Sequence, residues 1–183
     1  MELNATGWLS DVLQVKSPHY SERVDELAVD LIVVHCCSLP EGSYGTPYVD
    51  KLFTGVLSQE KCAEFKVNDV KVSAHFFITR LGEVRQYVSV YKKAWHAGRS
   101  VFQGRENCND YSIGIELEGT DRSKFEQVQY MKLNELIRVL KKHFPDITYD
   151  RIVGHSAIAP DRKTDPGEGF DWSLLKQLLE EQA

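Results

Sequence analysis

Short runs of β-branched and aromatic residues are interspersed with segments of helical periodicity, and this pattern limits the possible folds most strongly. The runs predict strands at residues 30–37, 72–79, 83–90, 111–118 and 151–155. Arg80-Leu81-Gly82 joins the second run to the third, and a glycine in so short a connection favours a β-hairpin. Strands mixed with helices along one chain predict an α/β fold, with helices flanking a central mixed sheet.

Three segments carry helical signals. Thr46 and Pro47 predict the start of a short helix over 47–57, because threonine can cap free amides and proline is tolerated at the first helical position. Apolar residues recur every three or four positions over 123–144, and Pro145 predicts the end of that helix. Asp171 predicts the cap of a last helix that runs from 172 to the carboxyl end. At 183 residues, the chain fits a single domain, 1–183, around one core.

Charge and hydropathy argue against several classes of protein. The formal net charge of −5 disfavours non-specific nucleic-acid binding, which draws its free energy from Lys and Arg. The longest aliphatic run, residues 31–34, is far shorter than the ~20 apolar residues of a membrane-spanning helix. The amino terminus lacks a basic start followed by an apolar stretch, so we expect no secretory signal and a cytoplasmic location. Reduced thiols are expected for the four cysteines, Cys36, Cys37, Cys62 and Cys108.

Two histidines at the ends of predicted strands are candidate metal ligands. His35 taken alone fits a structural histidine as well as a ligand. His155 ends another predicted strand and precedes a turn-rich loop, in which Lys163 and Asp165 project to the same side if the loop is extended. Two imidazoles and one carboxylate match the protein ligands of catalytic zinc, which keeps a fourth position for water. The alternative is a surface ion pair between Lys163 and Asp165.

The predicted strand 111–118 carries two glutamates on one face. Alternation places Glu116 and Glu118 on the face of Ser112 and Gly114, and the apolar residues on the other. The apolar face is expected to point into the core. The glutamates are then either solvated strand residues or, beside a cleft, candidate proton carriers.

Five longer strings occur along the chain in the order LIVVHCCSLP, VSAHFFITRLGEVRQYV, KKAWHAGRS, GRENCNDYSIGIELEGTD and IVGHSAIAPDRKTDPG. In these strings the chain resembles the muropeptide-recycling branch of the N-acetylmuramoyl-L-alanine amidases, a superfamily that includes peptidoglycan recognition proteins. The resemblance implies their central mixed sheet flanked by helices. It also implies that His35, His155 and Asp165 bind zinc, that Glu116 is the general base, and that Lys163 stabilises the oxyanion.

Further residues in or near these strings are candidates for substrate binding. Trp95 is either a cleft wall or a core aromatic. His96 and His75 either line the cleft or support the metal ligands, with plain packing as the alternative. Basic side chains could receive the carboxylates of the substrate peptide, with ordinary solvated cations as the alternative: Lys71, Arg99 and Arg105. Cys37 shares the strand face of His35 and could approach it, whereas Cys36 points away.

The resemblance also implies a reaction. It is hydrolysis of the amide between the lactyl group of 1,6-anhydro-N-acetylmuramic acid and L-alanine, with zinc as cofactor and an indirect role in limiting β-lactamase induction. We expect a small-molecule muropeptide substrate, a monomeric chain, and no nucleic-acid or membrane partner. The alternatives are a lytic amidase on intact peptidoglycan, disfavoured by the missing export signal, and a muropeptide-binding module without catalysis, disfavoured by Glu116 and Lys163.

Overall fold

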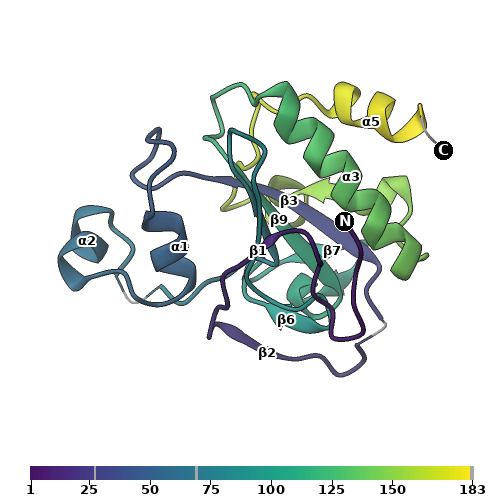
Figure 1. The fold of residues 1–183 in the computed structure, drawn as a ribbon, viewed down its shortest axis with the longest axis horizontal. Helices are drawn as coiled ribbons and strands as arrows, with labels where there is room; N and C mark the ends of the chain where they lie inside the picture. The colour runs from purple at the N-terminus through teal and green to yellow at the C-terminus, as the bar shows by residue number, and fades with distance from the viewer. Residues whose placement is uncertain (27, 69, 182–183) are drawn as a thin grey trace.

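The computed structural model describes residues 1–26, 28–68 and 70–181 and is built around a six-stranded sheet in the order β1-β5-β4-β9-β3-β10 (Figure 1). The strands of this sheet are β1 (Leu13–Gln14), β3 (Leu31–Cys37), β4 (Phe76–Ile78), β5 (Val84–Gln86), β9 (Ser112–Glu118) and β10 (Ile152–Gly154). β3 pairs in parallel with β9 and β10, and β9 in parallel with β4. β4 and β5 form the predicted antiparallel hairpin, so the sheet is mixed, as predicted.

Smaller elements surround the sheet. Two-stranded sheets pair β2 (Tyr20–Glu22) with β6 (Lys92–Ala94), and β7 (Val101–Phe102) with β8 (Arg105–Glu106). The helices are α1 (Tyr48–Phe53), α2 (Gln59–Glu64), α3 (Gln127–His143), α4 (His155–Ile158) and α5 (Trp172–Glu180), with 3-10 turns η1 (Cys108–Asp110) and η2 (Tyr149–Arg151). In the described ranges, none of the helices combines the length and apolarity needed to cross a membrane.

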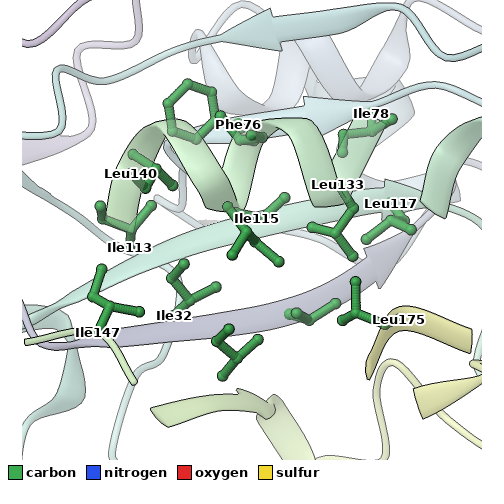
Figure 2. Packing of buried hydrophobic residues seen from close by; sticks show 14 of the residues in the cluster. Ile32, Phe76, Ile78, Ile113, Ile115, Leu117, Leu133, Leu140, Ile147 and Leu175 are labelled. Carbon is green, nitrogen blue, oxygen red and sulfur yellow. The ribbon is translucent and has the colours of Figure 1, made fainter. Parts of the chain in front are cut away.

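One face of the sheet packs against α3 and α5 and holds the main core. Alternation along β9 sends Ile113, Ile115 and Leu117 to this face, and all three are fully buried. Figure 2 shows them between the sheet and α3, where Leu133 and Leu140 lie. The polar residues of β9 therefore occupy the opposite face, as the sequence predicted.

The helices differ from the predictions at their ends. The helix predicted over 47–57 spans only Tyr48–Phe53, because Gly55 adopts a φ of +73° and turns the chain. Pro47 takes the N-cap position, while the hydroxyl of Thr46 donates to a carbonyl in the preceding loop. The helix predicted over 123–144 begins later, at Gln127, and ends at His143 before Pro145. Asp171 caps α5 as predicted, and residues 182–183 lie outside the described residues.

Candidate metal centre

Three side chains of metal-ligand type converge at the carboxyl edge of the parallel strands. His35 lies near the end of β3, and His155 follows β10 as the first residue of α4. Gly154 of β10 lies opposite Val34 of β3. The residues that follow them, His155 and His35, are therefore neighbours at the carboxyl edge of the sheet. Asp165 arrives from the loop after α4. Open edges of this kind commonly bind ligands in α/β sheets.

The candidate ligand atoms form an almost equilateral triangle. His35 Nδ1 lies 3.0 Å from His155 Nδ1 and 3.0 Å from Asp165 Oδ2, and His155 Nδ1 lies 3.1 Å from Asp165 Oδ2. Ligands around a tetrahedral zinc ion with bonds of about 2.0–2.1 Å are about 3.3 Å apart. An outward shift of a few tenths of an ångström at each atom would therefore admit the ion.

The second nitrogen of His155 supports this fit. His155 Nε2 lies 3.1 Å from the carbonyl oxygen of Ala97, which can only accept a hydrogen bond. A neutral imidazole that donates from Nε2 presents a lone pair at Nδ1. That lone pair faces the carboxylate of Asp165, and two acceptors this close repel each other unless a cation lies between them.

Burial and hydrogen bonding set the charges of the triangle. Burial lowers the pKa of His35 to about 4, against the opposing influence of the nearby Asp165 carboxylate. Burial alone would raise the pKa of Asp165, but its close contacts with His155 and His35 hold it below its usual range. A neutral imidazole and an ionised carboxylate are the protonation states that a divalent cation requires of its ligands.

Glu116 lies on the strand beside His35, on the same face. It is the register partner of His35 across the β3–β9 pair, and its Oε2 atom is buried with no hydrogen-bond partner among the described residues. Burial raises the pKa of Glu116 to about 8, and the charge of Asp165 adds to the effect. A cation held by the triangle would favour the ionised carboxylate. Glu116 is therefore placed as a proton acceptor whose free oxygen suits a water molecule.

Glu118 has a different environment on the same strand face. It is buried, and its carboxylate accepts hydrogen bonds from the backbone N–H of Gly45 at 2.5 Å and of Arg80 at 2.9 Å. Both oxygens are thus engaged in anchoring two loops. The structure therefore distinguishes the two glutamates that alternation alone placed together.

Lys163 lies two residues before Asp165 and is exposed. In the described part of the chain its ammonium makes no hydrogen bond, while its backbone N–H donates to the carbonyl of Ala159. Although burial has the larger influence on both groups, the Lys163 charge lowers the pKa of His35 and of Glu116. The ammonium is therefore a free cation within electrostatic reach of both side chains.

Two of the candidate substrate-binding residues, Trp95 and Lys71, come from neighbouring segments of the chain. Trp95 is half-buried, donates its indole N–H to Ser21, and stacks on His19 at a centroid distance of 6.0 Å. Lys71 is exposed and lies two residues before Ser73, whose N–H donates to the Trp95 carbonyl.

The remaining two cations have different surroundings. Arg99 is exposed and follows the Ala97 segment that contacts His155. Arg105 pairs with Asp30 at 3.2 Å and lies over the ring of Tyr111. Asp30 precedes β3, whereas His35 is near the end of that strand, so Arg105 is not brought to the triangle.

His96 is buried behind His35 and does not face open solvent. Its Nδ1 lies 2.9 Å from His35 Nε2, and its ring covers Gly114, where an added Cβ would come within 2.4 Å of it. The side-chain oxygen of Asn109 accepts from the N–H groups of His96 and Ala97, which fixes this segment. Sequence reasoning missed the Ala97 carbonyl, because no residue type marks a backbone acceptor, and it missed Asn109, because its contact with the His96 segment depends on the tertiary structure.

A cavity of about 520 Å³ borders the triangle at Asp165. Its lining combines the end of β3, the loops that follow β3, α2 and β9, and the Asp165 loop itself. Charged residues on this lining include Glu41, Glu64, Lys66 and Asp121. A volume of this size lies in the range of small-molecule sites.

Comparisons with known proteins agree with this arrangement. A sequence model of the family described as N-acetylmuramoyl-L-alanine amidase matches residues 25–168. The 1,6-anhydro-N-acetylmuramyl-L-alanine amidase AmpD of Escherichia coli (strain K12) is 48% identical over 177 residues, which is 96% of each chain. The crystal structure of a Se-Met AmpD derivative matches with a TM-score of 0.93 and 47% identity, over 98% of this chain and 99% of that chain.

A ligand complex is also among the similar structures. It is the complex of the amidase AmiD from E. coli with the substrate anhydro-N-acetylmuramic acid-L-Ala-D-gamma-Glu-L-Lys. It matches with a TM-score of 0.61 and 29% identity, over 82% of this chain and 57% of that chain.

Proposed function

Since the chain belongs to the N-acetylmuramoyl-L-alanine amidase family, we propose that it hydrolyses the amide between the lactyl group of 1,6-anhydro-N-acetylmuramic acid and L-alanine in cell-wall fragments. The observation that carries the proposal is the convergence of His35, His155 and Asp165 beside Glu116. The match to AmpD over almost the whole chain supports the anhydro sugar as substrate. We take residues 1–183 as one amidase domain that acts as a monomer.

We assign zinc to the triangle, with His35, His155 and Asp165 as its protein ligands. Two imidazole nitrogens and one carboxylate oxygen are a donor set that suits this ion and leaves a position open. When bound, the ion supplies Lewis acidity, which makes water a stronger acid and a carbonyl carbon more electrophilic.

Two side chains beside the triangle have separate roles: Glu116 transfers the proton, and Lys163 stabilises the negative charge. Glu116 accepts a proton from the water whose oxygen attacks the carbonyl carbon. The Lys163 ammonium faces the negative charge that develops on the carbonyl oxygen and stabilises it. Glu116 then delivers the proton to the alanine nitrogen as the C–N bond breaks, which releases the peptide and the sugar acid.

The same chemistry on intact peptidoglycan is the competing function. The match to the 1,6-anhydro-N-acetylmuramyl-L-alanine amidase AmpD, at 48% identity over 96% of the chain, favours soluble anhydromuramyl fragments instead. We therefore propose that the chain acts on such fragments, in the cytoplasm, with no nucleic-acid or membrane partner.

Purified protein is expected to release peptide from soluble 1,6-anhydromuropeptides much faster than from intact sacculi. The reason is that the proposed substrate is a single fragment that must enter a cleft beside Asp165. Mass spectrometry of both reactions measures the ratio, with protein stripped of metal as the blank. Comparable rates per enzyme on sacculi would instead favour the lytic function.

Lys163→Ala is expected to lower turnover by ~10²–10³-fold, as is usual when one oxyanion-stabilising group is lost. Zinc content and thermal unfolding should stay near wild type, because Lys163 is exposed and lies outside the ligand triangle. Lys142→Ala, on the exposed side of α3, is the matched control and should leave turnover, zinc content and thermal unfolding unchanged. Loss of zinc from Lys163→Ala would show that Lys163 supports the ligands and not the chemical step.

A further inference from the structure

A chain of polar contacts leads from the candidate metal ligand His35 into the protein. His35 Nε2 lies 2.9 Å from His96 Nδ1, and His96 Nε2 lies 3.2 Å from the hydroxyl of Ser112. The hydroxyl of Ser112 is 2.6 Å from the carbonyl oxygen of Cys108. The side chains of His35, His96 and Ser112 are all buried, so water does not compete for these contacts.

The last member of this chain decides the direction of every hydrogen bond in it. A carbonyl oxygen can only accept, so the single hydroxyl proton of Ser112 points to Cys108. The hydroxyl oxygen then accepts from His96, whose proton must be on Nε2. A neutral His96 with that proton has a lone pair at Nδ1, so the neighbouring proton belongs to His35 Nε2. His35 Nδ1 is therefore left bare, and this is the atom that lies in the ligand triangle.

We propose that Ser112 and His96 act as positioning residues that fix the tautomer of His35, so that its Nδ1 lone pair is directed at the metal. This rests on the proposed function, in which His35 is a zinc ligand. In His155 a single contact fixes the tautomer, since its Nε2 donates to the Ala97 carbonyl and leaves the Nδ1 lone pair directed at the metal. The partner of a ligand histidine usually sets its ring orientation and raises its basicity.

The backbone of β9 makes room for this arrangement. The His96 ring lies directly over Gly114, where any side chain would collide with it. His75 also packs against the His96 ring, but its Nδ1 accepts from the Gly114 N–H, and its Nε2 lies 3.0 Å from the Lys92 carbonyl and 3.2 Å from the Arg23 guanidinium. Both nitrogens of His75 thus have other partners, and His96 is left to contact His35 and Ser112.

The decisive experiment compares His96→Leu with His96→Asn. Both side chains branch at Cγ and have nearly the same size, but only asparagine offers an acceptor oxygen where His96 Nδ1 lies. His96→Leu should weaken zinc binding, measured by competition with a chelator, by ~10–100-fold, and His96→Asn should restore most of the affinity. Equal affinities in the two variants would overturn the proposal, because a space-filling role of His96 predicts that they behave alike.

A spectroscopic readout on the zinc-loaded protein tests the relay itself. In wild type and in His96→Asn, NMR should show the His35 Nε2 proton at a hydrogen-bonded chemical shift, and His96→Leu should lose that shift. Absence of a hydrogen-bonded proton on His35 Nε2 in the wild type would refute the proposal. If His96→Leu does not fold, Ser112→Ala keeps the His96 ring but removes its acceptor. It should then weaken zinc binding and allow both tautomers of His96, whereas wild-type behaviour in Ser112→Ala would contradict the relay.

His155→Ala separates this inference from the proposed function. Zinc that is lost from His155→Ala but bound normally by His96→Leu would refute the relay and leave the metal site intact. Zinc that His155→Ala retains in full would refute the ligand assignment, and the relay with it.

Discussion

His155→Ala is expected to yield a folded protein without bound zinc and without measurable turnover. The substitution removes one of three ligand atoms and leaves the Asp165 carboxylate with a single imidazole partner, His35. It also opens a space at a buried position beside the Ala97 carbonyl. Elemental analysis after dialysis, with activity on an anhydromuropeptide, measures both expected losses.

Two comparisons make this result specific. His143→Ala changes an exposed histidine at the end of α3 and should keep one zinc per chain and full activity. Chelation of wild type should reproduce the inactive state, and added zinc should restore wild type but not His155→Ala. A folded His155→Ala protein that retains a full complement of zinc would show that the ion binds elsewhere.

Glu116→Gln should lower turnover by ~10²–10⁴-fold while zinc stays bound, the usual contribution of a positioned acid or base. The amide keeps the size and shape of the side chain but does not take up a proton near neutral pH. Glu116 is not one of the three triangle atoms, so the affinity for zinc should change little. Single-turnover rates and zinc stoichiometry on the same preparation test the two statements together.

Glu118→Gln is the matched control, since it makes the same change two residues along the same strand face. Its carboxylate anchors the backbone of Gly45 and Arg80, so we expect mainly a loss of stability, ~1–3 kcal/mol, from the impaired buried hydrogen bonds. If Glu116→Gln retained near-normal turnover with zinc bound, Glu118 would become the leading candidate for the base. Zinc loss from Glu116→Gln would mean that Glu116 supports the ligands.

The sequence was sufficient for the central strands because they are long and buried on the α3 face. Alternation in β3 and β9 correctly separated His35 and Glu116 from the residues that pack against α3. The resemblance to the amidase family is confirmed by the full-length match. The roles of His35, His155, Asp165, Glu116 and Lys163 remain predictions, and the variants above test those of His155, Glu116 and Lys163.

Other features depend on contacts that the sequence pattern does not encode. The helix α2 has no buried residue, so it carries no apolar periodicity to detect. The strands β1, β2, β6, β7 and β8 have two or three residues each and exist because a partner strand lies beside them. Arg105 looked like a free cation, but its pairing with Asp30 is a tertiary contact.

His96 shows the same limit at the site. Its string predicted a cleft-lining or supporting role, with plain packing as the alternative. The structure surrounds His96 with Gly114, Asn109 and Ser112, which come from a different part of the chain. Ser112 was correctly placed on the face of Glu116. Its link to His35 through a histidine from the β6–β7 connection required the three-dimensional structure.

The pairing of β3 with β9 also determines which changes of length this protein can accept. His35 and Glu116 are held opposite each other by the register of the two strands, and no loop contributes to that alignment. Deleting one residue of β9 ahead of Glu116 would shift the carboxylate by one position and turn it toward α3, into the apolar layer. Additions to the loop between β3 and α1 would leave the alignment unchanged. These two strands must therefore keep their residue count in variants and designs, and so must the loop that brings Asp165 to the triangle.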